Sequence, residues 1–581
     1  MRPLKEATLA AVGLAVLVAC GPLGGATGQS QRGSSTQDLR FPVGTDFATL
    51  DPAYLDTQTD AEIAQNLFDG LLDQADDLRI VPAIASAMPS ISADGLTYTF
   101  RLRRDVTFSN GDGVTARDVL YSWNRAAALQ GPYSTNLAAI VGFDKLPAKP
   151  PPPAQVEQLL AKNDKSVTLS GLTAPDGPDG YTVRVRLTQP AGWFLSAISQ
   201  PGVVGMIVDQ KVVAGDPKRW WAKPGTLVGT GAYRMVARTP GRSADFAAVP
   251  NWWSSPKPAV ARVHVGILPD SRDREAAYEQ GGYDINGYGG FSNLDLRDTL
   301  RIQRTRGLKD QLQLRPGGRT YWVSFNLRAD SRRKAVGPFI DSAGSSARAL
   351  RTAFTLAIDK KKLAAAVCRG VLCAPATGGI ITKGLQGYLG DDADPLAGFD
   401  PARAKGLLRA ADPDGSKTKG LVYVYDPEDP VNRPTARNLQ EQWHTNLGVD
   451  VQVRSEPHAR FIVDRLNGSL VLSRDGWTAD YDHPEDWFDD KFGSLAGCPD
   501  LNCSSGYATA QFDRLATQAD ALPLQRALPV YRQMSKMLSD EVAYIPLYHT
   551  LNAFMVKPYV SGAGANALLD HRWNSIHILP H

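Results

Sequence analysis

Apolar and polar residues alternate in several short segments of the chain, the pattern of a strand with one buried face. In the clearest of them, Tyr98, Phe100 and Leu102 alternate with threonine and arginine. The segments with this period of two are residues 97–103, 183–187, 421–425 and 449–453. We therefore expect strands at four widely separated places.

Helix-like stretches lie between these segments. Residues 118–129 are entered through Thr115, and residues 402–411 follow an Asp-Pro pair, both favourable at a helix start. Residues 347–367 are rich in Ala and Leu. The Pro-rich residues 146–154 are too stiff for a helix or strand interior and predict an exposed loop. Because strands and helices interleave throughout, the fold class is predicted to be α/β.

The N-terminus has the pattern of an export signal. Arg2 and Lys5 precede the apolar residues 9–19, a run too short to span a membrane. The run ends in Leu-Val-Ala before Cys20, which resembles the lipobox of bacterial lipoproteins, in which the cysteine is lipidated. The alternative is an ordinary secretory signal. Residues 1–20 are expected to be a lipoprotein signal peptide, and the Gly/Ser-rich residues 21–39 a flexible tether.

Composition narrows the class of protein. Of 581 residues 43% are hydrophobic, enough for a sizeable core, and 63 Lys and Arg against 60 Asp and Glu leave a formal charge of only +3. This balance argues against a broad basic face for nucleic acid. Beyond the first twenty residues no run of 18 apolar residues occurs, so membrane contact is expected only through a lipid on Cys20.

The remaining cysteines form two C-x4-C pairs, Cys368 with Cys373 and Cys498 with Cys503. Four thiolates can bind zinc. In an exported chain two local disulfides are the favoured interpretation, because the compartment is oxidising. Free thiols are the third alternative.

Catalytic motifs are missing from the sequence. It contains no G-x-S-x-G, no phosphate-binding P-loop and no H-E-x-x-H, and His571, His577 and His581 near the C-terminus favour surface or packing roles. We expect no enzyme, no cofactor and no metal. Residues 475–488 stand out, since two Trp and five acids there offer an apolar wall and a counter-charge for an amine. An acidic loop with packed aromatics is the alternative.

A series of short blocks follows in a fixed order along the chain. These blocks are residues 50–52, 66–72, 81–85, 94–103, 108–111, 115–119, 229–233, 251–253, 325–326, 353–359, 476–481 and 545–547. Their order resembles the family 5 extracellular solute-binding proteins of ABC importers. On residues 120–125, 132–133 and 477–481, the chain is most similar within that family to the oligopeptide-binding lipoproteins.

The resemblance implies a two-lobed periplasmic-binding-protein-like (Venus flytrap) fold that closes around its ligand, with an additional subdomain inserted in the first lobe. The implied divisions are residues 40–75, 206–310 and 541–581 for lobe I, 76–205 for the inserted subdomain Ib, and 311–540 for lobe II.

The resemblance also implies a peptide site. Asp480 matches the position that pairs with the peptide's terminal amine, and Trp477 and Thr478 match residues that line the same pocket. The other ligand contacts implied by matching positions are Asp56, Thr57, Gln58, Tyr133, Arg465 and Arg474.

The function implied is capture of oligopeptides by a monomeric receptor, anchored to the outer face of the membrane, which passes them to ABC permease subunits. One alternative keeps the fold and changes the cargo to a metal chelate, an oligosaccharide or another small molecule. The other is an exported enzyme such as a hydrolase.

Overall fold

The structure is a computed structural model that describes residues 37–200, 204–287, 293–328, 334–340, 344–494, 505–564, 566–568 and 572–581. The expected signal peptide, Cys20, most of the expected tether, Cys498 and Cys503 lie outside these residues. In the part of the chain that the structure describes, no helix combines the length and the hydropathy needed to cross a membrane.

The first sheet has the order β1 (Asp38–Val43), β10 (Arg262–Ile267), β9 (Ser243–Ala248) and β8 (Tyr233–Thr239), with β1 parallel to β10. Leu39 and Phe41 of β1 are fully buried. The expected tether to residue 39 is therefore corrected, since its last residues already pair with β10. Trp573, close to the C-terminus, packs against Phe41 and Phe246 in the same core.

A second, smaller sheet follows in the chain, in the order β4 (Ser90–Ile91), β5 (Thr97–Arg101), β7 (Thr182–Arg186) and β6 (Leu172–Thr173). The alternation at 97–103 and 183–187 predicted β5 and β7. Helices α2 (Ala116–Leu129) and α3 (Pro153–Ala161) lie beside it, and a capping box of Thr115 and Asp118 begins α2. The loop predicted at 146–154 ends two residues early, at residue 152, because Pro153 occupies the first turn of α3.

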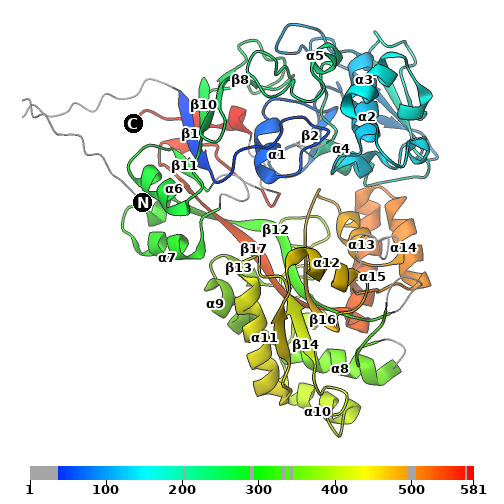
Figure 1. Ribbon diagram of the computed structural model, residues 1–581, viewed down its shortest axis with the longest axis vertical. Helices are drawn as coiled ribbons and strands as arrows, with labels where there is room; N and C mark the ends of the chain where they lie inside the picture. Colours follow the sequence, from blue (N-terminus) through cyan, green and yellow to red (C-terminus); the bar gives the residue numbers. More distant parts are fainter. Residues whose placement is uncertain are drawn as a thin grey trace, which may run out of the picture.

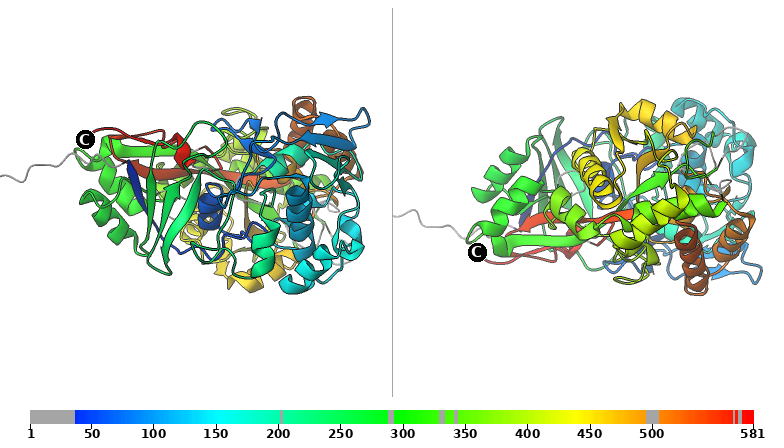
Figure 2. Two further views of the ribbon diagram at one scale, coloured as in Figure 1. Left: turned by 90° about the horizontal axis from the view of Figure 1, so that it is seen from above. Right: turned by 90° about the horizontal axis from the view of Figure 1, so that it is seen from below.

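The third sheet is the largest. Its order is β11 (Ile285–Asn286), β17 (Tyr544–Val556), β12 (Leu312–Phe325), β16 (Leu472–Thr478), β14 (Val422–Tyr425) and β15 (Gln452–Ser455), and β13 (Cys373–Pro375) also pairs with β17. The long strands β12 and β17 run side by side from the part of the molecule that holds β1 and β10 into the part that holds β14 (Figures 1 and 2). They join the two parts of the molecule.

Two predicted elements of this region need correction. Residues 347–367 form two helices, α8 (Gly344–Leu356) and α9 (Lys360–Cys368), because the Asp359 side chain accepts hydrogen bonds from the first backbone N–H groups of α9 and starts a new helix. The strand predicted at 449–453 begins only at Gln452, which pairs with Val422. Val449 and Val451 are buried but precede the ladder.

The other helices and short strands complete the fold. They are α1 (Gln58–Ala64), α4 (Phe194–Ser199), α5 (Gln210–Gly215), α6 (Ser271–Glu279), α7 (Leu296–Arg304), α10 (Pro401–Ala411), α11 (Asn432–Leu447), α12 (His458–Leu466), α13 (Glu485–Lys491), α14 (Ala510–Asp520), α15 (Leu524–Glu541), β2 (Leu72–Gln74), β3 (Ile80–Pro82), β18 (Val560–Ser561) and β19 (His577–Ile578).

Candidate ligand-binding cleft

A cavity of about 950 Å³ lies between segments that are far apart in sequence. One wall comes from the start of α1 and from Tyr133, and the other from β12, the end of β16, β17 and the loop that follows β14. Its volume lies within the range of small-molecule sites. The cavity is therefore built where the two halves of the chain face each other.

Asp480 lines this cavity just beyond the end of β16. Behind it, Asp486 Oδ2 accepts hydrogen bonds from the Asp480 backbone N–H and the Trp477 indole N–H, each at 3.2 Å. Trp477 thus fixes the turn and is not among the lining residues, whereas Thr478 is. Asp486 therefore holds the turn that presents Asp480 to the cavity.

Three carboxylates gather at this point. Oxygens of Asp480, Asp486 and Asp490 lie within 4.8 Å of one another. Burial, together with the Asp490 charge, raises the pKa of Asp480 to about 7, and burial raises that of Asp490 to about 6. An incoming cation would stabilise the ionised forms. The arrangement suits an ammonium group, and the same oxygens are of the type that binds hard metal ions.

The opposite wall carries the other expected contacts. Asp56, Thr57 and Gln58 line the cavity at the start of α1, where the Thr57 side chain accepts a hydrogen bond from the Asp60 backbone N–H at 3.2 Å. Tyr133 lines it too, and its pKa is raised by burial and then by the nearby charges of Asp480 and Asp56. Tyr133 thus lies within the electrostatic reach of carboxylates on both walls.

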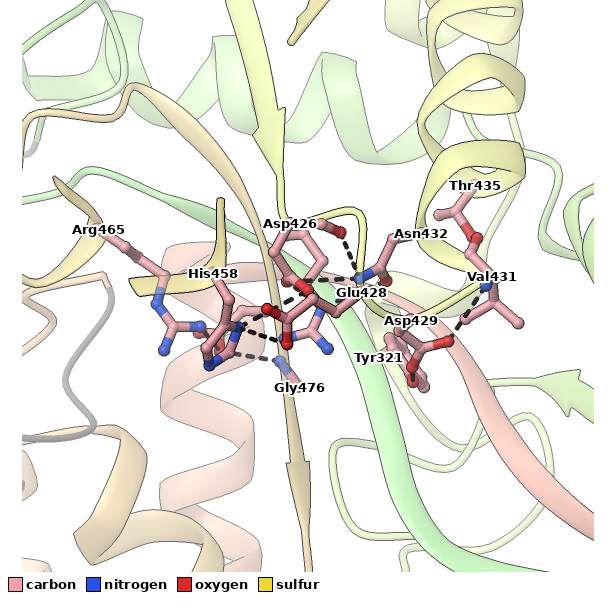
Figure 3. A network of polar contacts seen from close by, with 12 residues as sticks. Tyr321, Asp426, Glu428, Asp429, Val431, Asn432, Thr435, His458, Arg465 and Gly476 are labelled. Carbon is pink, nitrogen blue, oxygen red and sulfur yellow. Dashed lines mark hydrogen bonds and ion pairs between the residues drawn. The ribbon is translucent and has the colours of Figure 1, made fainter. Parts of the chain in front are cut away.

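The two expected arginine contacts lie elsewhere. Arg465 donates to Asp475 Oδ1 at 2.7 Å, and both side chains are buried. Arg474 donates to Asn432 Oδ1 at 3.3 Å and lies 3.7 Å from Asp426, and Figure 3 labels both of these partners. Neither arginine is among the lining residues, because buried acceptors hold both guanidinium groups behind the cavity wall.

A lining group that the sequence did not suggest surrounds Tyr321. Arg319 lies over the Tyr321 ring at 4.3 Å and donates to Asp429 Oδ2 at 3.3 Å. The Tyr321 hydroxyl donates to the same carboxylate (Figure 3). All three residues line the cavity. Arg319 and Tyr321 are two residues apart in β12 and therefore share a face of the strand, whereas no local pattern pointed to Asp429.

The cavity wall also includes a disulfide. Cys368, at the end of α9, is bonded to Cys373, at the start of β13, and both residues line the cavity. The bond ties α9 to a strand that pairs with β17. It therefore stiffens one border of the cavity.

Comparison with known proteins identifies relatives along nearly the whole chain. A model of the bacterial extracellular solute-binding proteins, family 5 (middle), matches residues 79–496. The chain is 25% identical over 565 residues to the periplasmic murein peptide-binding protein MppA of Escherichia coli K12, covering 94% of each chain. It is 23% identical over 553 residues to the periplasmic oligopeptide-binding protein OppA of the same organism, covering 93% of this chain and 92% of that one.

A third relative is named for a different solute, the probable deoxycholate-binding periplasmic protein YgiS of Escherichia coli K12, 25% identical over 537 residues and covering 90% of each chain. Among solved structures, the unliganded open form of MppA superposes with a TM-score of 0.77 at 23% identity, covering 94% of this chain and 98% of that one. This likeness confirms the predicted α/β periplasmic-binding-protein fold.

Proposed function

The chain belongs to the bacterial extracellular solute-binding proteins of family 5, and from that premise we propose that it captures oligopeptides and delivers them to the permease subunits of an ABC transporter. The family consists of solute-binding proteins, in agreement with the expectation that the chain is not an enzyme. Relatives named for peptide binding along more than nine-tenths of the chain support peptides as the cargo.

One observation carries the proposal. Asp480 lines the cavity, and burial, together with the Asp490 charge, raises its pKa to about 7. A peptide brings an ammonium group that neutralises such a site, and hydrogen bonds to charged groups are stronger than those between neutral groups. Asp56, Thr57, Gln58 and Tyr133 on the facing wall then contact the ligand as the two sides close.

The proposal includes two lobes with the divisions given above and a lipid anchor on Cys20. The long strands β12 and β17 pass from one part of the molecule to the other, which supports a hinge along them. A tether from Cys20 to β1 would leave the body free to meet a permease at the membrane.

The first experiment is native mass spectrometry of the mature protein, purified without added ligand, followed by denaturation and sequencing of the released molecules. Short peptides are expected. Calorimetry with the identified peptides and Asp480→Asn then tests the site. Release of only non-peptide molecules, or full peptide affinity in Asp480→Asn, would contradict the proposal.

The second candidate function keeps the fold and changes the cargo to another small molecule. The relative named for deoxycholate supports it, as do apolar lining residues such as Leu55, Val431 and Leu568. Thermal-shift competition between peptides and deoxycholate separates the two, because only a bound ligand raises the apparent stability. A shift with deoxycholate alone would favour this second function.

A further inference from the structure

The cavity offers opposite charges at two places, and this polarity fits the two ends of a peptide. At the acidic side, Asp480 is backed by Asp486 and Asp490. At the basic side, the Arg319 guanidinium lies over the Tyr321 ring, 4.3 Å from its centroid, while Arg474 lies 5.3 Å from the same ring but outside the cavity lining. A zwitterionic ligand placed along this direction meets a complementary charge at each terminus.

The strand register fixes how far apart these sides lie. Arg319 is directly opposite Thr478 in the pairing of β12 with β16, and the Ala479 backbone N–H donates to Gly318 O at 2.9 Å. Asp480 is two residues beyond Thr478, which corresponds to about 7 Å along a strand, and neighbouring strands lie about 5 Å apart. The Cα atoms of Arg319 and Asp480 are therefore separated by roughly 8 to 9 Å.

Arg319 has the accessibility that a ligand-binding cation needs. A third of its side chain is exposed, at 33%, and its hydrogen bond to Asp429 uses one of the five N–H donors of a guanidinium. Asp429 also accepts hydrogen bonds from the Tyr321 hydroxyl and, at 3.1 Å, from the Val431 backbone N–H. Asp429 therefore stays in place when Arg319 turns to a second carboxylate.

The other arginines near the cavity are less suited. Arg474 is 11% exposed and bound to Asn432 and Asp426 behind the wall. Arg297 lines the cavity, but it donates to both Asp295 and Asp298. Arg319 is thus the lining arginine with a single carboxylate partner among the described residues.

We propose that Arg319 binds the C-terminal carboxylate of a peptide whose N-terminal amine is held by Asp480, and that the spacing of the two residues selects peptides of about three residues. This inference rests on the proposed function. An extended chain covers at most about 3.6 Å per residue, so three residues span about 10 Å, slightly more than the Cα separation of roughly 8 to 9 Å. A dipeptide spans about 7 Å, less than this Cα separation, and a longer peptide carries its carboxylate beyond Arg319.

The experiment is isothermal titration calorimetry on ligand-free mature protein at pH 7.5, with di-, tri- and penta-alanine, each as the free acid and as the C-terminal amide. Wild type, Arg319→Gln and Arg319→Lys are compared. Arg315→Gln is the matched control, because Arg315 lies on the same strand, is exposed and is not among the lining residues. Circular dichroism verifies that each variant is folded.

We expect the wild type and Arg315→Gln to bind the free acid of trialanine about tenfold or more tightly than its amide. Arg319→Gln is expected to bind both forms with the affinity of the amide, and Arg319→Lys to retain part of the difference. Equal affinity for acid and amide in the wild type, or an undiminished difference in Arg319→Gln, would overturn the assignment. A difference that is largest for the di- or pentapeptide would overturn the selection of length.

These results are distinguishable from failure of the proposed function. If wild type binds trialanine acid and amide equally well, peptide binding stands and only Arg319 loses its role. If wild type produces no heat with any of the six ligands and none of the peptides released from the purified protein binds again, both proposals fall.

Discussion

Replacing Asp480 by asparagine is expected to have opposite effects on peptide binding and on the stability of the empty protein. Asp480 lies beside Asp490 in a partly buried acidic group, where burial, together with the Asp490 charge, raises the pKa of Asp480 from 3.8 to about 7. The ionised carboxylate that attracts a ligand amine therefore destabilises the folded protein while the cavity is empty. Asp480→Asn keeps the shape of the side chain and removes its charge.

The effect on stability depends on pH. A carboxyl group with a folded-state pKa above its unfolded value contributes stability below the unfolded pKa, near 3.8, and loses it as pH rises through about 7. At about 1.36 kcal/mol per pKa unit, and with the shift shared with Asp490, ionisation costs about 2 to 4 kcal/mol above pH 7. Asp480→Asn removes this loss, so the variant is expected to be more stable than the wild type at pH 8 and similar at pH 4.

The effect on binding has the opposite sign. Truncating one partner of a desolvated charge pair costs about 2 to 5 kcal/mol, which is about 30-fold or more in affinity for an amine. Wild-type affinity for peptides is expected to decrease as pH falls below about 7, because Asp480 becomes protonated. Asp480→Asn lacks this decrease on the acid side.

Differential scanning fluorimetry from pH 4 to 9 and calorimetry with a free-amine peptide measure the two effects. For a chain of this size, a change of a few kcal/mol corresponds to a Tm shift of a few degrees. Asp540→Asn is the control, because Asp540 is an exposed carboxylate whose partner is Lys536. A variant that binds peptide like the wild type, or that is less stable than the wild type at pH 8, would refute this account of Asp480.

Three further outcomes are expected. Replacing both Cys368 and Cys373 by alanine removes a cross-link that closes a loop of a few residues, and should lower the free energy of unfolding by about 2 kcal/mol in urea titrations; no change would contradict this. Asp475→Asn leaves the buried cations Arg465 and Lys491 without their shared carboxylate and should lower the free energy of unfolding by about 3 to 5 kcal/mol in the same titrations; an unchanged free energy of unfolding would contradict this. Cys20→Ala should move the protein from the membrane to the soluble fraction of cells; retention on the membrane would argue against the lipid anchor.

The fold class follows from local patterns, because period-two alternation is a direct consequence of a half-buried strand. Residues 97–103 and 183–187 show this alternation and form the neighbouring strands β5 and β7. The predicted ends of helices and strands were wrong where a tertiary contact or a helix cap determines them. Asp359 divides a stretch of continuous helical composition, and the ladder with Val422 begins only at Gln452.

The candidate site could be predicted only in part, and the reason is the range of its interactions. Asp480 and Thr478 lie in one short segment whose composition already suggested an amine site. Arg319 and Asp429 are separated by 110 residues and meet because the loop after β14 folds over β12. Arg465 and Arg474 lie outside the cavity lining, and their positions along the chain gave no indication of the acceptors that bind them, Asp475 and Asn432.

The acidic group of Asp480, Asp486 and Asp490 lowers the stability of the empty protein, and ligand binding explains why such a group is present. Burying several carboxylates of like charge disfavours the folded state at neutral pH, and such perturbed groups concentrate at functional sites. Lys491 offsets part of this repulsion at Asp490, whereas no cation among the described residues counters the raised pKa of Asp480. Asp486 fixes the turn through the Asp480 and Trp477 N–H groups, so it cannot be removed without loosening the site. A bound ammonium group would relieve the repulsion. The ligand amine would then bind this group more tightly than it would bind an isolated surface carboxylate. Part of the binding free energy would come from relieving the repulsion between carboxylates that is already present in the empty protein.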